Sequence, residues 1–122
     1  MIVGVGVDIC EVERIGRAVQ KGAFLERYFT EEERAYLAER GSVRDQSAAG
    51  IFAAKEAMLK ALGTGLLIPL RDVGVSHTEA GAPQAVLAGA AAERLSELGG
   101  ARMHLSISHD GGMAVAMAVA EG

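Results

Sequence analysis

The N-terminal segment, residues 2–9 (IVGVGVDI), constrains the fold more than any other part of the chain. Its side chains alternate between two faces: Val3, Val5, Val7 and Ile9 on one, and Ile2, Gly4, Gly6 and Asp8 on the other. A period of two predicts a β-strand. The two glycines leave the second face bare, so that another backbone or a ligand can approach closely. This face ends in the carboxylate of Asp8.

The most helical part of the sequence extends from about Gln46 to Leu62 (QSAAGIFAAKEAMLKAL). It is rich in good helix formers, and an apolar stripe passes through Ile51, Ala54, Met58 and Leu62. Gly63 is predicted to end this helix, because glycine accepts the left-handed conformation common just after a helix. Glu56 lies on a second, partly apolar side, where we expect it to be half-buried.

Weaker patterns predict the other elements, and their mixed order indicates an α+β domain over residues 1–122 with a mainly antiparallel sheet. Thr30 followed by Glu33 has the pattern of a capping box, so a short helix is expected to begin there. Gly41–Asp45 is polar and loop-like. The further expected elements are helices over residues 12–20 and 88–98, a hairpin with strands over 72–78 and 84–87, and strands over 103–108 and 114–120, the last apolar on both faces and therefore central.

Composition excludes several functions. With 12 basic and 16 acidic side chains the net charge is −4, which argues against duplex DNA or an anionic membrane as the main partner. Only 4% of the residues are aromatic, so few rings are available to stack on single-stranded nucleic acid. No signal peptide or membrane span is visible, and the single Cys10 cannot form an intrachain disulfide, so a cytoplasmic protein is expected.

Three patches of the sequence have residues suited to chemistry: Asp8, the Lys55-Glu56 pair with Lys60, and the turn from Ser106 to Asp110. Taken alone, Asp8 is equally suited to capping the next element, and Glu56 with Lys60 to an exposed ion pair one helical turn apart. Taken together, Asp8 and Glu56 are two carboxylates of the kind that complete an Mg²⁺ shell with substrate phosphates and water.

Other motifs are weaker. Ser108-His109-Asp110 is not a hydrolase triad, because neighbours in a strand point to opposite faces; His109 is then an ordinary turn residue or a donor to a phosphate. Gly63-Thr64-Gly65 resembles a fragment of a phosphate loop without its complete pattern, and alone is a helix stop. Cys10, His77 and His104 do not have the spacing of zinc ligands, so no metal is assigned to them. A local excess of basic residues comprises Arg14, Arg17, Lys21 and Arg27. The basic set suits an acidic protein partner or plain solvation.

In combination these motifs resemble the holo-[acyl-carrier-protein] synthases of the 4′-phosphopantetheinyl transferase superfamily. The resemblance rests on the segments VGVGVDICEVERI, FAAKEAMLKALGTG and HLSISHD, and spans nearly the whole chain. It implies a 4′-phosphopantetheinyl transferase-like fold, usually a homotrimer with sites between subunits. It also implies a Mg²⁺-dependent transfer of 4′-phosphopantetheine from coenzyme A to a serine of apo-acyl carrier protein, releasing adenosine 3′,5′-bisphosphate.

The resemblance also implies residue roles. Asp8 and Glu56 match the family's metal ligands, and Lys60, together with Lys55, matches positions associated with the coenzyme A phosphates. His109 matches a histidine near the pyrophosphate, which makes Asp8, Glu56, Lys60 and His109 the expected catalytic set. Gly63 to Gly65 match a loop beside the nucleotide, and Arg14 matches a basic position that meets the carrier protein. Ile51 departs from the pattern, because the family often has arginine there.

The mechanism expected from these roles is an in-line attack of the carrier serine on the β-phosphorus, with charge neutralised by Mg²⁺. A metal-oriented water, Glu56 or Asp110 would accept the serine proton. Two rival interpretations remain: an RNase H-like metal-dependent nuclease with Asp8 as a metal ligand, and a non-catalytic module that binds coenzyme A or a metal.

Overall fold

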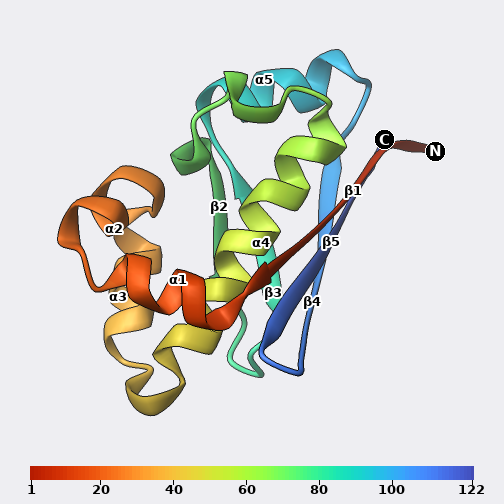
Figure 1. Cartoon of the computed structure of the whole chain (residues 1–122). Coiled ribbons are helices and arrows are strands. Elements are labelled where there is room, and N and C mark those ends of the chain that lie inside the picture. Colours follow the sequence, from red (N-terminus) through yellow and green to blue (C-terminus); the bar gives the residue numbers. More distant parts are fainter.

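Three antiparallel strands form the larger sheet, in the order β1-β5-β4, in the computed structural model of residues 1–122. The strands are β1 (Ile2–Glu11), β4 (Arg102–Asp110) and β5 (Met113–Glu121). A long helix, α4 (Arg44–Leu62), packs across one face of this sheet (Figure 1). A second antiparallel sheet pairs β2 (Val73–His77) with β3 (Pro83–Leu87). The predicted α+β class and antiparallel sheet are therefore confirmed.

Shorter helices surround this frame. Three of them, α1 (Val12–Val19), α2 (Gly22–Tyr28) and α3 (Glu31–Ala38), gather beside the N-terminal half of α4, and α5 (Gly89–Glu97) lies at its other end (Figure 1). Single 3-10 turns, η1 (Gly41–Val43), η2 (Gly65–Leu67) and η3 (Leu70–Asp72), connect them. Every helix is too short or too polar to serve as a transmembrane span.

The glycine face of β1 is packed directly against α4. A Cβ atom at Gly4 would overlap the carbonyl oxygen of Ala61, and one at Gly6 would overlap that of Ala57. The close backbone approach predicted from the sequence is thus confirmed. It brings Asp8, in the second half of β1, next to the part of α4 that carries Lys60.

The opposite face of the large sheet is open in a single chain. Val5, Val7 and Ile9 of β1 are 65%, 53% and 58% exposed, and Met117 of β5 is 52% exposed. The expectation of a central β5 is confirmed by the strand order, but only its alanines, Ala114, Ala116, Ala118 and Ala120, are buried. The strand is apolar on both faces although α4 covers only one of them.

Local signals predicted most element boundaries. The capping box is present, since Glu33 N donates to Thr30 Oγ1 at 3.1 Å and Thr30 N donates to Glu33 Oε1 at 2.9 Å. Two differences stand out. α4 begins at Arg44, inside the expected polar loop, and α2 was not predicted at all. α2 has only seven residues, and Phe24, Leu25 and Tyr28 pack half-buried against the core, so the segment is too short for a periodicity argument to detect.

Candidate active site

The exposed side of α4 is narrow. Phe52, Glu56 and Lys60, spaced four residues apart, form its only open stripe over the second half of the helix, and the residues between them are buried. Asp8 of β1 lies next to this stripe, because the glycines before it hold the strand against the helix. Glu56 is half-buried, as its partly apolar side had suggested.

Lys60 connects the strand to the helix. Its Nζ donates to Asp8 Oδ1 and to the Val7 carbonyl oxygen, both at 3.0 Å. The Asp8 side chain is only 11% exposed, whereas that of Lys60 is 54% exposed. Lys60 therefore pairs with Asp8 and not with Glu56, so the simple exposed helix pair considered from the sequence does not form.

The pKa of Glu56 depends on its surroundings in the site. Burial raises the pKa of Glu56 above its ordinary value, and the nearby Asp8 carboxylate raises it further. Lys60 and Arg14 act in the opposite direction on the same pKa, which places both cations close to Glu56. Two carboxylates held together against their mutual repulsion are suited to binding a cation.

The donor set fits Mg²⁺ in particular. The chain contains no group of three or more histidine, cysteine or acidic side chains arranged for a metal, so a fully protein-ligated site is absent. A pair of carboxylates leaves positions for substrate phosphates and water, which is how Mg²⁺ is usually held. Cys10, near this pair, is not a suitable ligand: its thiol contacts the Ala49 carbonyl oxygen, and burial raises its pKa to about 11.

The loop after α4 borders the same site. Gly63 ends the helix with a φ of 72°, and Gly65 has a φ of 56°. A cavity of about 260 Å³ is lined by Glu56, Leu59, Lys60, Gly65 and Leu66. The structure thus brings Gly65 together with Glu56 and Lys60.

Lys55 is not part of this site. Its side chain is fully buried, and Nζ lies 2.7 Å from Oε1 of Glu33, which is also fully buried. This corrects the expectation that Lys55 binds coenzyme A phosphates, because an enclosed ammonium group cannot contact a ligand. Successive residues of a helix are rotated by about 100°, so Lys55 points into the core while the neighbouring Glu56 lies at the surface of α4.

His109 lies on the other flank of α4. Its Nε2 is 2.8 Å from the Gln46 carbonyl oxygen, near the beginning of the helix, and also lies close to Gly50. Asp8 belongs to β1 and His109 to β4, the two outer strands of the sheet, and α4 lies between their side chains. One chain alone therefore does not bring His109 to Asp8 and Glu56.

A small polar cavity of about 190 Å³ adjoins His109. Its wall contains Tyr36, Arg40 and Ser47, which the sequence analysis missed, and His77, to which it assigned no metal. The rings of Tyr36 and His77 are stacked 4.0 Å apart, and the Arg40 guanidinium lies 5.1 Å from the Tyr36 ring centre. Burial, followed by the Arg40 charge, lowers the pKa of His77. Their signal was hidden because they come from four separate parts of the chain, namely α3, the loop after it, α4 and β2, with no common motif.

Arg14 and Ile51 complete the expected set. Arg14 is exposed on α1 and makes none of the chain's ion pairs, whereas Arg17 pairs with Glu13 at 2.8 Å. Ile51 is 1% exposed and belongs to the core. The position at which the family often has arginine therefore packs internally here and offers no cation to a ligand.

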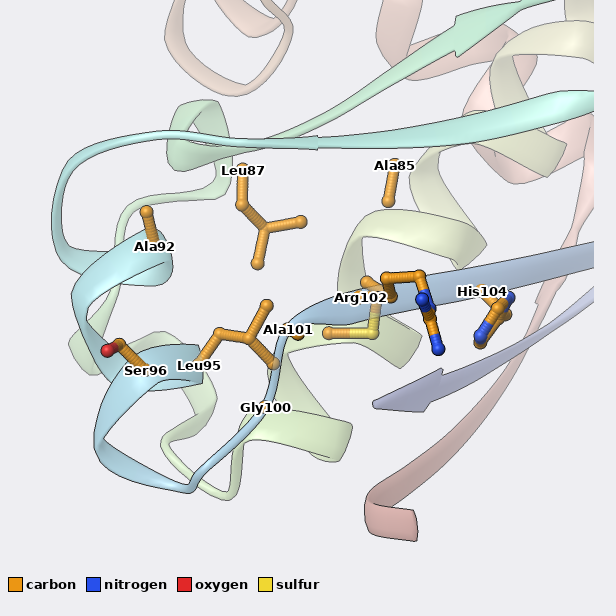
Figure 2. Close-up of a pocket in the computed structure, with 10 residues that line it drawn as sticks. Ala85, Leu87, Ala92, Leu95, Ser96, Gly100, Ala101, Arg102 and His104 are labelled. Atoms are coloured by element: carbon orange, nitrogen blue, oxygen red, sulfur yellow. The ribbon is translucent and has the colours of Figure 1, made fainter. Parts of the chain in front are cut away.

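A separate groove of about 510 Å³ lies between β3, α5 and the start of β4 (Figure 2). Leu87 and Leu95 extend into it, and Arg102 and His104 stand at one end. None of the expected site residues lines this groove, so it is distinct from the Asp8–Glu56 site.

Comparison with known proteins places the chain in a family. A family model described as the 4′-phosphopantetheinyl transferase superfamily matches residues 4–118. The chain is 43% identical over 123 residues to a holo-[acyl-carrier-protein] synthase of Treponema denticola, covering 100% of both. Among solved structures it resembles the Neisseria meningitidis synthase (TM-score 0.86, 36% identity, 100% of both chains) and the Helicobacter pylori synthase in complex with coenzyme A (TM-score 0.82, 32% identity, 96% of this chain and 99% of that one).

The antiparallel α+β fold and the acidic pair beside a lysine define a chain of the phosphopantetheinyl transferase class. With near-complete coverage by the model and the relatives, the chain belongs to the holo-[acyl-carrier-protein] synthase family of the 4′-phosphopantetheinyl transferase superfamily. It is accordingly an enzyme of the transferase type.

Proposed function

We propose that this domain, residues 1–122, transfers 4′-phosphopantetheine from coenzyme A to a serine of apo-acyl carrier protein in a Mg²⁺-dependent reaction. The observation that carries the proposal is the juxtaposition of Asp8, Glu56 and Lys60 at the contact between β1 and α4. Relatives named holo-[acyl-carrier-protein] synthase and a related structure solved with coenzyme A support the donor and the acceptor.

Asp8 and Glu56 are the proposed metal ligands. Bound Mg²⁺ would supply positive charge to the pyrophosphate oxygens of coenzyme A, where negative charge develops during transfer. Lys60 would be able to exchange Asp8 for a phosphate oxygen, since its side chain is half-exposed. Gly65 offers approach without a side chain at the edge of the same cavity.

The reaction that these residues would promote breaks one bond and forms one. The serine oxygen bonds to the β-phosphorus, the bond from that phosphorus to the bridging oxygen breaks, and adenosine 3′,5′-bisphosphate leaves. Lys60 and His109 would stabilise the departing phosphate. A metal-oriented water, Glu56 or Asp110 would take the serine proton.

His109 would reach this chemistry from a second copy of the chain. In one chain it lies across α4 from Asp8, beside its own polar cavity. A ring in which the β1 flank of one subunit meets the β4 flank of the next would unite the two halves, and head-to-tail contacts of this kind close into rings. The open sheet face around Val7 and Met117 is suited to being buried in such an assembly. We therefore propose a homotrimer with sites between subunits.

Arg14 is the proposed anchor for the carrier protein. It is exposed, carries a charge free of partners in the chain, and lies close enough to Glu56 to lower the pKa of that carboxyl. An acidic carrier bound to Arg14 would present its serine beside the carboxylate pair.

The decisive experiment is mass spectrometry of apo-acyl carrier protein incubated with the enzyme, coenzyme A and Mg²⁺. The expected result is the mass increase of one phosphopantetheine, lost when EDTA is present and lost in Asp8→Ala. Binding of coenzyme A without any mass increase would support a non-catalytic module instead. Metal-dependent cleavage of branched DNA would favour the nuclease interpretation. An undiminished increase with Asp8→Ala would refute the proposed site.

A further inference from the structure

The C-terminal end of α4 presents an electrostatic problem for the proposed donor site. The last carbonyl groups of a helix have no partners within it, and the aligned peptide dipoles give that end a partial negative charge. Lys60 lies in this last turn, and Gly63 and Gly65 follow it. Coenzyme A is a multiply charged anion, so its phosphates would approach the end of a helix that repels them.

Arg94 of α5 neutralises this end. Its Nε donates to the Leu62 carbonyl oxygen at 3.0 Å, and its Nη2 lies 3.8 Å from the position that a Cβ of Gly63 would take. In Figure 1, α5 stands beside the upper end of α4, where the helix passes into the loop. The guanidinium group is 35% exposed at its side chain, so it is partly shielded from the screening of bulk water.

The other free carbonyls nearby are satisfied by the loop itself. Gly63 N donates toward the Leu59 and Lys60 carbonyl oxygens, and Thr64 N donates to Leu59 at 3.3 Å. These backbone donors bring no net charge. Lys60 is also charged but directs its ammonium group to Asp8, so Arg94 is the side chain that brings a positive charge to the terminal carbonyl groups. The Glu97 carboxylate, 3.7 Å away, opposes it.

We propose that Arg94 is a positioning residue for coenzyme A: it cancels the negative end of α4 and fixes the Gly63–Gly65 loop, so that the donor phosphates can settle beside Lys60. This inference rests on the proposed function. The two cations have different proposed roles. Lys60 contacts coenzyme A directly, whereas Arg94 acts indirectly by neutralising the C-terminal end of α4. Arginine suits this role because its planar group donates to a carbonyl and carries charge at once.

The test compares Arg94→Gln, Arg94→Lys and Arg71→Gln, the last being an exposed arginine on η3 that makes no ion pair in the chain. Calorimetry gives the Kd of coenzyme A with Mg²⁺, and the transfer assay gives KM and kcat. For Arg94→Gln we expect Kd and KM to rise about two- to fivefold with kcat unchanged, the size expected of a charge at a helix end. Arg94→Lys should recover most of the loss, and about 0.5 M salt should shrink it.

A variant with the opposite sign keeps the test independent of any folding defect. Glu97→Gln removes the carboxylate that opposes Arg94, so coenzyme A should bind up to about twofold more tightly. Unchanged Kd in both Arg94→Gln and Glu97→Gln, with melting curves showing folded protein, would overturn the inference. So would an equal loss in Arg71→Gln. Failure of the wild type to bind coenzyme A would instead refute the proposed function, and this inference with it.

Discussion

Lys55 and Glu33 form an ion pair in the interior, with 2.7 Å between Nζ and Oε1 and both side chains fully buried. The same carboxylate accepts the Val75 N–H at 2.7 Å and the Thr30 N–H at 2.9 Å, so it ties α3 to α4 and β2. Burial lowers the pKa of Lys55, whereas the Glu33 carboxylate opposes that change. The pair thus fixes the helix from which Glu56 projects.

Lys55→Met should unfold the protein at lower urea concentration, with a loss of about 3–5 kcal/mol, because it leaves a buried carboxylate uncompensated. The double variant Lys55→Met with Glu33→Gln should recover a large part of that loss, since no charge remains buried and the amide still accepts a hydrogen bond. A single variant as stable as the wild type would contradict the role assigned to the pair.

Glu56→Gln should stabilise the metal-free protein at neutral pH. The folded-state pKa of Glu56 is raised, so the ionised carboxylate opposes folding, and wild-type stability falls as pH rises through the interval between the ordinary and the raised pKa. The advantage of Glu56→Gln should therefore be present near pH 8 and shrink as pH falls toward about 4, where the wild-type side chain is protonated. Urea unfolding in EDTA at several pH values measures it.

The control for that series is Glu93→Gln on α5, an exposed glutamate outside the chain's ion pairs. Its stability relative to wild type should vary little with pH. An equal pH dependence in both variants would show that net charge, and not the burial of Glu56 and its contact with Asp8, is responsible.

Gly6→Ala should destabilise the fold severely, because its Cβ would overlap the Ala57 carbonyl oxygen and backbone cannot move aside cheaply. A loss of about 2–4 kcal/mol is expected from overpacking of this kind. Gly22→Ala is the matched control. No atom lies within 4 Å of the added Cβ, and the residue begins α2, so a gain of about 0.5 kcal/mol is expected. Thermal melting of both variants distinguishes a packing effect from a general effect of replacing glycine.

Met117→Lys should dissociate the proposed homotrimer, because it places a charge at the centre of the open apolar face of the large sheet. Light scattering should show the monomer mass for this variant and the trimer mass for the wild type. Val86→Lys serves for comparison, since Val86 is 47% exposed but lies on β3, outside that face. A wild type of monomer mass would rule out the trimer, and a trimeric Met117→Lys would place the interface elsewhere.

Much of this site could be predicted from the sequence because the patterns that indicate it are local. The alternation in β1 predicted both the strand and the close approach at Gly4 and Gly6, and the capping box predicted the start of α3. The inward direction of Lys55 was missed, because one residue along a helix turns a side chain by about 100° and no local pattern marks which of two charged neighbours is buried. Arg94 was missed as well, since its partner Leu62 is 32 residues away and offers only a backbone oxygen.

The separation of Asp8 and His109 across α4 has a genetic consequence. If each reaction centre takes its carboxylates from one subunit and its histidine from the next, two differently damaged chains can repair one another. Asp8→Ala and His109→Ala, each inactive alone, should regain activity when the two variants are unfolded and refolded together. In an equal random mixture, about one quarter of the sites between subunits would have both the wild-type Asp8 and the wild-type His109. Variants that are refolded separately and then mixed should stay inactive until they exchange subunits.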